Sequence, residues 1–523
     1  IFIYSYNIMS TFADEQYLAP DPNNFVNQSV EYLSARQPIA ATCSNTIKIT
    51  PSNGGVYSNQ SDFVEFRINP QHNSFIDGTK TKLNLTFSAN AASTGTADFT
   101  VNSQGSVMNV FKRITVSSNG EMLEDITDAN HILAMMTNLY TSKSQLCSGP
   151  TVQDLFADEF TGAIGGKSTG KELSYYTAGQ VPAGGATPFS CSVPIMLSSL
   201  FGPSARKSIP IGMLRNGLMV RFYFTDKVEE VYYAQIASGA GLALSAGSGY
   251  TVKNVSLEVK TIRFDDAAFE AIRNNLKTNN LEWDATTFIS NLVSCNPANP
   301  SVRLLLTNTN YRDVKSIYVQ SWYSARTVGQ TMPYSSVFPG LYQANVLVNG
   351  DPVNSRSIGI GDVTAIKNSI PQLVMNLQST TRASNEILHM DCQLGPQFTQ
   401  AGNAATDVLL GYSNYTPTTA ATNDYPVGGP NAVPNQLGPY GAGSAAEFQG
   451  IDTPSMYWGL STLTSNDKSR ELTGMDLRTK QTVLQMERYN TITGSADQVI
   501  QGVLVVGEKF HLDVVAGLLT RTL

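Results

Sequence analysis

Apolar and polar residues alternate with a period of two in many short stretches of the chain. Leu83, Leu85 and Phe87, for example, alternate with Asn84 and Thr86. The same alternation recurs at residues 47–49, 220–224, 255–259, 302–306 and 510–514. Because residues i and i+2 lie on the same face of a strand, each stretch predicts a β-strand with one face on a core. Short strands separated by Gly, Pro and Asn clusters predict an all-β sandwich or barrel, not alternating strands and helices.

Helical spacing of apolar residues is clear in two places. It runs from Asp128 to Tyr140, where Thr127 or Asp128 can cap the helix, and from about Asp266 to Lys277. The second stretch directly follows a predicted strand, and we take it as the end of a first domain. The adjacent acidic pair Asp265-Asp266 is expected to cap this helix and not to serve as paired catalytic carboxylates.

The two halves of the chain repeat two short patterns in the same order. Asn119-Gly120 recurs as Asn349-Gly350, each flanked by apolar residues, and Gly212-Met213-Leu214-Arg215 recurs as Gly474-Met475-Asp476-Leu477-Arg478. Asn-Gly between apolar runs is a strong hairpin signal, since both turn residues take positive φ. The offsets of 230 and 262 residues are each about half of the 523-residue chain. A duplicated β domain is therefore predicted.

Charge is low and slightly negative. Charged residues make up 14% of the chain, against roughly 25% in average soluble proteins, and the net charge is −7. The first basic residue is Arg36, so there is no basic N-terminal arm. A protein that wraps nucleic acid needs many cations to neutralise phosphates, so we expect no specific nucleic-acid binding.

Cysteine usage and hydropathy indicate a reducing compartment and no membrane span. The five cysteines are an odd number without a Cys-x-x-Cys motif, which favours reduced and mostly buried thiols. They are Cys43, Cys147, Cys191, Cys295 and Cys392. No apolar run reaches 18 residues, so no transmembrane helix is expected. The apolar start, residues 1–7, lacks a basic region, and we expect no secretory signal; Met9 is the expected natural start, with residues 1–8 an upstream extension.

Motifs that could carry chemistry are weak. Residues 162–168 end in Gly-Lys-Ser, but a phosphate-binding loop needs glycine where Thr161 stands. Residues 166–170 match Gly-x-Ser-x-Gly without the strand–turn–helix context of a nucleophilic serine. None of the four histidines has metal-ligand spacing: His72, His131, His389 and His511. We predict no enzyme, and no catalytic, cofactor-binding or metal-binding residues.

Some of these positions have an expected structural place. We expect His131 at the boundary between core and solvent on its helix, and His511 on the strand face opposite Phe510 and Leu512. The three tryptophans are expected to pack in a core or an interface and not to stack on a ligand. They are Trp283, Trp322 and Trp458.

Together these features resemble a double jelly-roll major capsid protein of tailless double-stranded DNA viruses, of the polinton-like virus and virophage type. The residues that carry the resemblance are the two Asn-Gly hairpins, the two Gly-Met…Leu-Arg elements, and the run from Tyr250 to Leu257 that leads into Phe264-Asp265-Asp266. It implies two tandem eight-stranded antiparallel jelly rolls with short helices and long inter-strand loops. The expected division is an N-terminal arm (1–40), jelly roll 1 (41–277), a linker (278–285) and jelly roll 2 (286–523).

The resemblance also implies an assembly. Three subunits would form a homotrimeric, pseudo-hexagonal capsomer that tiles an icosahedral shell, with penton and minor capsid proteins as further partners. The Gly-rich stretches 141–187 and 395–450 would be outer loops that contact neighbouring subunits. The protein would be located in the virion and assembled inside the host cell.

Two other classes of function remain open from the residues. One is a secreted or surface β-sandwich that binds carbohydrate or acts as an adhesin; it would be favoured by a signal peptide and paired cysteines. The other is a β-sandwich glycoside hydrolase, which needs two opposed carboxylates. Trimers that grow into shells would favour the capsid reading, and a monomer that binds glycans would favour the adhesin.

Overall fold

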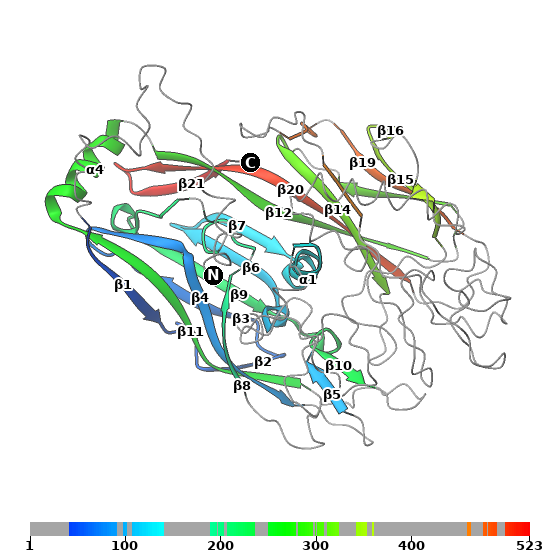
Figure 1. The fold of residues 1–523 in the computed structure, drawn as a ribbon, viewed down its shortest axis with the longest axis horizontal. Helices are drawn as coiled ribbons and strands as arrows, with labels where there is room; N and C mark the ends of the chain where they lie inside the picture. The colour runs from blue at the N-terminus through cyan, green and yellow to red at the C-terminus, as the bar shows by residue number, and fades with distance from the viewer. Residues whose placement is uncertain are drawn as a thin grey trace, which may run out of the picture.

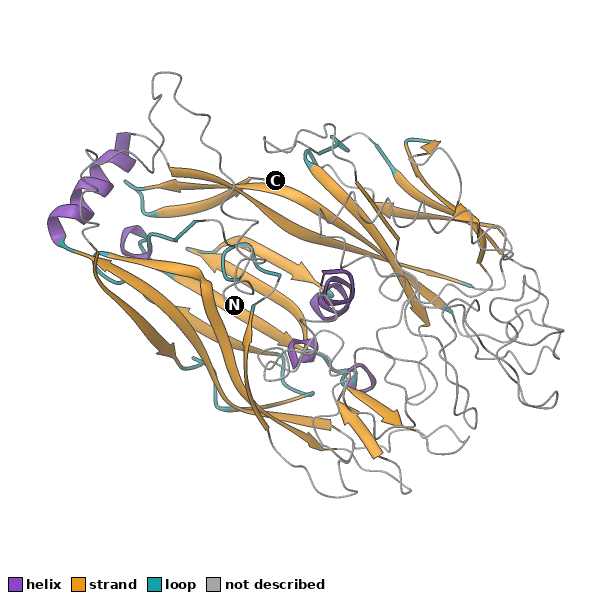
Figure 2. Ribbon diagram, in the orientation of Figure 1, coloured by secondary structure: helices purple, strands orange, loops and turns teal. Residues whose placement is uncertain are grey.

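The computed structural model describes residues 41–90, 98–101, 107–140, 189–235, 249–278, 281–307, 311–323, 341–352, 358–359, 458–461 and 474–522, apart from short gaps inside some of these ranges. The described residues form two β-sandwiches side by side (Figures 1 and 2). We call them roll 1 and roll 2.

Roll 1 consists of two antiparallel sheets that face each other. The first sheet has the order β1 (Ala41–Ile49), β11 (Gly249–Phe264), β4 (Ser74–Asn90) and β8 (Phe189–Pro194), with β2 (Val56–Ser58) also paired to β11. The second sheet has the order β3 (Phe63–Ile68), β9 (Leu218–Phe224), β6 (Phe111–Ser118) and β7 (Glu121–Thr127).

Roll 2 repeats this plan. Its first sheet has the order β12 (Leu281–Cys295), β20 (Gln498–Asp513), β14 (Val314–Tyr323) and β18 (Trp458–Ser461), with β21 (Leu518–Thr522) paired to β20. Its second sheet has the order β13 (Ser301–Thr307), β19 (Thr482–Arg488), β15 (Leu341–Val348) and β16 (Asp351–Pro352), with β17 (Ile358–Gly359) paired to β15.

The strand order identifies the topology of both rolls. In each roll the first main strand pairs with the last, the last with the third, and the third with the sixth; the second pairs with the seventh, the seventh with the fourth, and the fourth with the fifth. This exchange of strands between two face-to-face sheets is the jelly-roll arrangement. The prediction of two antiparallel jelly rolls is confirmed.

Smaller elements lie around the rolls. They are the helices α1 (Ala129–Tyr140) and α4 (Asp266–Thr278), the 3₁₀ turns η2 (Val107–Val110), η3 (Ile211–Met213) and η4 (Val228–Glu230), and a ribbon of β5 (Asp98–Val101) and β10 (Tyr232–Gln235). Both helices match the predicted stretches. The backbone N–H of Ala268 donates to Asp265 Oδ1 at 2.6 Å, so Asp265 caps α4 as predicted.

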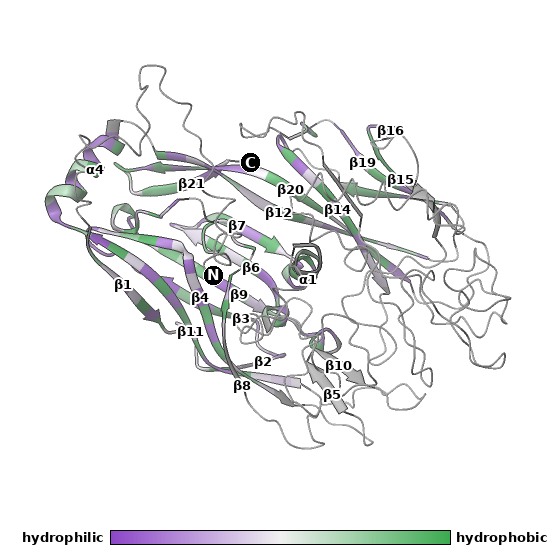
Figure 3. Cartoon of the chain, in the orientation of Figure 1, coloured by the Kyte–Doolittle hydropathy of each residue, from purple (hydrophilic) through white to green (hydrophobic). Residues whose placement is uncertain are grey.

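The observed burial of side chains agrees with the predicted strands. Leu83, Leu85 and Phe87 on β4 are buried at 0–2% exposure, and Figure 3 shows the alternation of hydrophobic and hydrophilic residues along the strands of roll 1. The predicted stretch 510–514 extends one residue past the end of β20 at Asp513. Aromatic rings fill much of the core of roll 1, where Phe111 lies 5.2 Å from Phe222 and 5.1 Å from Phe224 between ring centroids.

Both repeated sequence patterns occupy equivalent places in the two rolls. Asn119 and Gly120 have φ of 53° and 84°, and Asn349 and Gly350 have φ of 55° and 91°. They turn β6 into β7 and β15 into β16, as a hairpin with two positive-φ residues requires.

The glycine of the second pattern lets its segment lie close to the backbone at or just before the start of the third strand of its roll. A Cβ at Gly474 would lie 2.1 Å from the backbone oxygen of Val314, and a Cβ at Gly212 would lie 2.7 Å from that of Gln71. Met475 then bridges to Val314 on β14, just as Ile209 bridges to Ile76 on β4. The duplication therefore extends to these connections.

The boundary between the rolls is short in the described chain. Helix α4 ends at Thr278 and β12 begins at Leu281, inside the range 278–285 that was predicted as a linker. The domain limits themselves remain a prediction. The N-terminal arm and the stretches 141–187 and 395–450 lie outside the described residues.

Candidate functional site at the junction of the two rolls

One continuous apolar core joins the two rolls. It contains the core of roll 1 and, from roll 2, a group of residues of the first sheet and of the turn that follows β20: Trp283, Ala285, Tyr318, Val503, Phe510, Leu512, Val514 and Leu519. Figure 1 shows β12, β20 and β21 running beside β6 and β7, and contacts join β7 to both β12 and β21. Leu123 and Ile126 on β7 are fully buried in this core. A second core lies inside roll 2 alone.

Trp283 is central to this shared core. Its ring lies 5.4 Å from that of Phe510, its direct cross-strand partner, and its exposure is 5%. Trp283 and Trp322 confirm the prediction of core or interface packing, since both are buried. Trp458 lies on β18, and its side chain lies outside the described part of the structure.

Helix α1 provides a second contact between the rolls. The imidazole of His131 stacks on Trp322 of β14 with ring centroids 4.0 Å apart and planes 6° from parallel. Its Nε2 lies 3.1 Å from Glu230 Oε1, and Gln320 Nε2 donates to its backbone oxygen at 3.1 Å. The prediction that His131 lies at the edge between core and solvent is wrong, because roll 2 covers the face of α1 that roll 1 leaves open. The sequence of α1 alone does not indicate that roll 2 packs on this face of the helix.

Polar side chains extend the junction beside α1. Ser290 Oγ donates to Asp128 Oδ2 at 2.8 Å, and Gln501 Nε2 donates to Ser290 Oγ at 2.7 Å. Gln320 Nε2 in turn donates to Gln501 Oε1 at 2.5 Å. Since buried polar groups are costly without partners, this chain of hydrogen bonds fixes how the two rolls fit together.

A buried carboxyl group from roll 1 lies in the same junction. Glu124 of β7 is 0% exposed. Ser198 Oγ donates to its Oε2 at 2.5 Å, and the backbone N–H groups of Ser199 and Leu200 donate to its Oε1 at 2.6 and 3.2 Å. The hydroxyl of Ser199 contacts the same Oε1, and it also lies 2.8 Å from Oε1 of Glu508 on β20.

Glu508 is the matching carboxyl group from roll 2. It is 3% exposed, and its Oε2 lies 2.8 Å from Nε of Arg521 on β21, whose side chain is 9% exposed. Burial raises the pKa of Glu124. Burial and the nearby charge of Glu124 together raise the pKa of Glu508 to about 7, although Arg521 acts to lower it. Two carboxyl groups, one guanidinium and two serines thus meet between the rolls.

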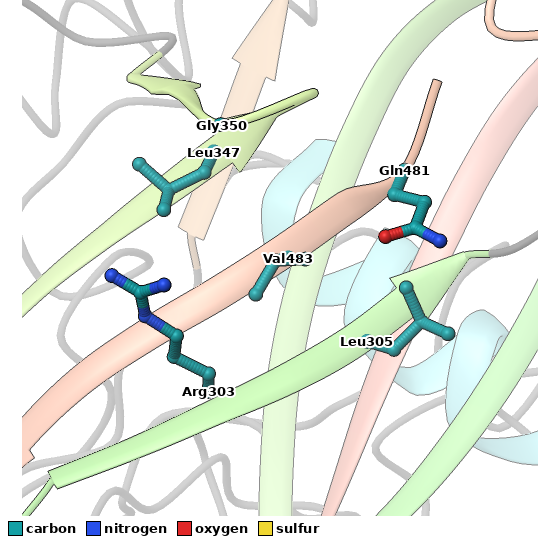
Figure 4. A pocket seen from close by; sticks show the side chains of 6 residues that line it. All are labelled: Arg303, Leu305, Leu347, Gly350, Gln481 and Val483. Carbon is teal, nitrogen blue, oxygen red and sulfur yellow. The ribbon is translucent and has the colours of Figure 1, made fainter. Parts of the chain in front are cut away.

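The outer face of roll 2 carries a shallow apolar hollow of about 370 Å³ (Figure 4). It lies on the second sheet and is lined by Arg303 and Leu305 of β13, Leu347 of β15, Val483 of β19, Gly350 in the turn between β15 and β16, and Gln481 just before β19. Leu305 is 39% exposed. The four residues on strands are outward positions, since their neighbours Leu304, Val346 and Leu484 point into the core of roll 2.

The weak chemical motifs are not brought together by the described structure. Residues 162–168, the overlapping 166–170 and His389 lie outside the described residues. His72 lies 3.6 Å from Asp266 at the surface, and His511 lies 3.3 Å from Glu282. His511 is on the opposite face of β20 from Phe510 and Leu512, as predicted. No group of three or more His, Cys, Asp or Glu side chains in the described parts of the chain is placed to hold a metal ion.

Cys295 is buried, as expected of the cysteines, whereas Cys43 on β1 is exposed. No helix within the described ranges is long and apolar enough to span a membrane.

Sequence reasoning missed the carboxyl groups of the junction, although one signal was present. Along β20, Glu508 has the same strand parity as Leu504, Val506, Phe510 and Leu512, all of which are buried. A charged residue on the buried face of a period-two pattern marks a position that needs a partner. The contacts of Glu508 are Ser199, in the segment before β9, and Arg521 on β21, and only the first links it to roll 1; local sequence does not reveal that link.

No protein-family model matches this chain, and no curated protein matches it in sequence. Solved structures do match. A chain of the Sputnik virophage structure determined at 3.5 Å by cryo-electron microscopy matches with TM-score 0.52 and 10% identity, covering 92% of this chain and 89% of that one. The Faustovirus major capsid protein matches with TM-score 0.50 and 10% identity, covering 93% and 92%.

The chain has the double jelly-roll fold. A third match supports this at the same level: VP54 of PBCV-1, as fitted into a reconstruction of the virophage Sputnik, has TM-score 0.50, 10% identity, and coverage of 92% and 96%. The similarity extends over both rolls, because more than nine-tenths of the chain is covered in each comparison. It agrees with the strand order found in each roll.

Proposed function

We propose that this protein is a major capsid protein that forms homotrimeric, pseudo-hexagonal capsomers and that these tile an icosahedral virus shell. The observation that supports it best is the junction inside one chain, where two copies of the same fold are joined side by side through different faces. The match to the Faustovirus major capsid protein over 93% of this chain agrees with this role.

The internal junction suggests how subunits would join. Roll 1 contributes β7 and α1, on its second-sheet side, and roll 2 contributes its first sheet, including β21. Each chain therefore leaves the second sheet of roll 2 and the first sheet of roll 1 at its two ends, within the described residues. If the second sheet of roll 2 meets the first sheet of roll 1 in the next copy, the contact is heterologous and repeats around a ring. Three chains give six rolls in such a ring.

The exposed face of roll 2 is suited to this contact. Leu305, Leu347 and Val483 form an apolar surface there, and Arg303 and Gln481 border it. Protein interfaces combine an apolar centre with a polar rim and few charges at the centre. The low charge of the whole chain, 14%, is in keeping with a protein that uses much of its surface for contacts.

The proposed role is structural. It rests on shape and contact area and requires no catalytic, cofactor-binding or metal-binding residue, so we propose that the protein is not an enzyme. The proposed location is the virion, after assembly inside the host cell. Neighbouring capsomers, penton proteins and minor capsid proteins are the proposed partners beyond the trimer. The carbohydrate-binding alternative finds no support in the comparisons.

Native mass spectrometry of the purified protein tests the proposed trimer through Leu305→Asp. The buried charge would cost more than the apolar contact it replaces, so we expect trimers for the unmodified protein and predominantly monomers for the variant. Val515→Asp is the matched control, because Val515 is 80% exposed on the turn between β20 and β21, away from this sheet. It should leave trimers intact. A trimer that survives Leu305→Asp would contradict this placement of the interface.

The same sample separates the proposal from its rival. Particles or hexagonal arrays seen by negative-stain electron microscopy would support the capsid role. A protein that stays monomeric at every concentration and binds glycans on an array would overturn it and favour the adhesin.

A further inference from the structure

The hydroxyl of Ser199 lies between two buried carboxyl groups that belong to different rolls. Its Oγ is in hydrogen-bond contact with Oε1 of Glu124 and lies 2.8 Å from Oε1 of Glu508. A serine hydroxyl has one hydrogen and can donate to one of these oxygens at a time. The other contact is attractive when that carboxyl group carries a proton and donates it to the serine oxygen. The geometry therefore requires one bound proton in the cluster.

The remaining hydrogen bonds place this proton on Glu508. Glu124 already accepts from Ser198 Oγ and from the backbone N–H groups of Ser199 and Leu200, which are donors that favour an ionised carboxylate. Glu508 has Arg521 at its Oε2 and the Ser199 hydroxyl at its Oε1. With Ser199 donating to Glu124, the protonated Oε1 of Glu508 donates to Ser199.

The charges balance in this state. Glu124 is negative, Arg521 is positive and Glu508 is neutral, so the buried cluster has no net charge. Loss of the proton leaves two carboxylates beside one guanidinium, with a net negative charge in a site that is almost without solvent. A buried charge without a partner is strongly unfavourable.

The other charged residues nearby do not compensate for that charge. Lys509 and His511 follow Glu508 on β20 but lie on the opposite face of the strand. There Lys509 is 3.7 Å from Glu282 and 4.0 Å from Asp284, and His511 also lies beside Glu282. Ala285 is opposite Glu508 on β12. On β7, Asp125 is paired with Arg113. Ser198 and Ser199, in the segment before β9, are neutral.

We propose that Glu124, Ser199 and Glu508 form a proton-operated latch between the two rolls, which holds them together while it carries one proton and weakens their junction when that proton is lost. All three groups and Arg521 belong to a single chain, so the inference goes beyond the proposed capsid role and does not depend on it. In an assembled shell, the same latch would make each subunit looser in alkaline surroundings.

The direction of the pH effect follows from the pKa of Glu508, which burial and Glu124 raise to about 7 from an ordinary value of 4.5. The folded state then holds a proton that the unfolded state releases, so stability is greatest below the ordinary pKa and is lost as the pH rises to about 7. Burial also raises the pKa of Glu124, which shifts stability in the same direction. The unfolding equilibrium constant should rise by up to about 10²-fold across this window.

The first experiment uses the unmodified full chain. Infrared difference spectra recorded between pH 5 and pH 9 should show the carbonyl stretch of one buried protonated carboxyl group that disappears as the pH rises through about 7. Unfolding by urea, followed over the same range, should become easier in the same window. A spectrum without such a band at pH 6 would overturn the proposal even if no variant could be produced.

Glu508→Gln then assigns the proton. Glutamine is neutral at every pH, can donate to Ser199 through its amide and keeps an oxygen beside Arg521, so the variant should fold, lose the infrared band and lose the pH dependence of urea unfolding between pH 5 and 8. Glu270→Gln on α4, where Glu270 forms an exposed ion pair with Arg273, is the matched control and should keep both. A Glu508→Gln protein with an unchanged band and an unchanged pH profile would assign the proton elsewhere and contradict the latch.

Discussion

Phe510→Ala tests whether the two rolls unfold as one unit. The ring of Phe510 is 0% exposed, packs 5.4 Å from Trp283 and belongs to the core that both rolls share. Truncation of a buried phenylalanine costs about 3–5 kcal/mol, because the transfer free energy is lost and a cavity remains. Because the core is shared, this loss should lower the free energy of unfolding of both rolls together.

The size of the shift in melting temperature distinguishes one unit from two. Unfolding entropy is about 2.1 cal/mol/K per residue, so the 523-residue chain has about 1.1 kcal/mol/K if it unfolds together. The loss of about 3–5 kcal/mol then lowers the midpoint of one transition by about 3–5 °C. If roll 2 unfolded alone, with half the entropy, the same loss would lower its own midpoint by about 5–9 °C and leave roll 1 unchanged.

Differential scanning calorimetry measures both quantities. The matched control is Leu484→Ala, since Leu484 on β19 is 0% exposed and belongs to the core inside roll 2 alone. Both variants should lower the midpoint of the same single transition. Two separate heat-absorption peaks in the unmodified protein, with Phe510→Ala moving one of them, would refute the argument from the shared core.

Two further predictions concern local structure. Gly474→Ala should destabilise the protein by about 1–3 kcal/mol in urea titrations, because the added Cβ would lie 2.1 Å from the backbone oxygen of Val314. Gly55→Ala is the control, since a Cβ at Gly55 would meet nothing within 4 Å. Equal effects of the two substitutions would show that the close approach at Gly474 is unimportant. Asp265→Ala removes the cap of α4 and should cost about 1 kcal/mol in the same assay, whereas Asp265→Asn should retain most of that stability; equal losses in both variants would argue against capping.

Much of the fold was predictable because local sequence patterns determine its strands, helices and turns. Period-two alternation marked strands such as residues 83–87 and 220–224, and helical spacing marked α1 and α4. The repeated Asn-Gly turns and the repeated Gly-Met elements revealed the duplication, since each serves a backbone requirement: positive φ at Asn349-Gly350, and a close approach to β14 at Gly474. Because each requirement restricts which residue type can occupy the position, both patterns can be recognised in the sequence.

The junction between the rolls was not predictable in the same way. His131 was expected at an edge because its own helix says nothing of Trp322, which lies nearly two hundred positions later and covers it. Glu124 and Glu508 likewise both contact Ser199 through a fold that brings β7 against β12 and β21. Contacts between sequence-distant strands depend on tertiary packing, and no local pattern contains them. The predicted outer loops and the N-terminal arm stay predictions.

A cryo-electron microscopy map of the purified protein tests most directly whether three chains join through the second sheet of roll 2. We predict three chains about a threefold axis, with the sheet of β13, β19 and β15 in each chain facing the sheet of β1, β11 and β4 in the next, and Leu305 buried between them. A map of single, separate chains, or of a trimer in which that sheet of roll 2 is open to solvent, would contradict it.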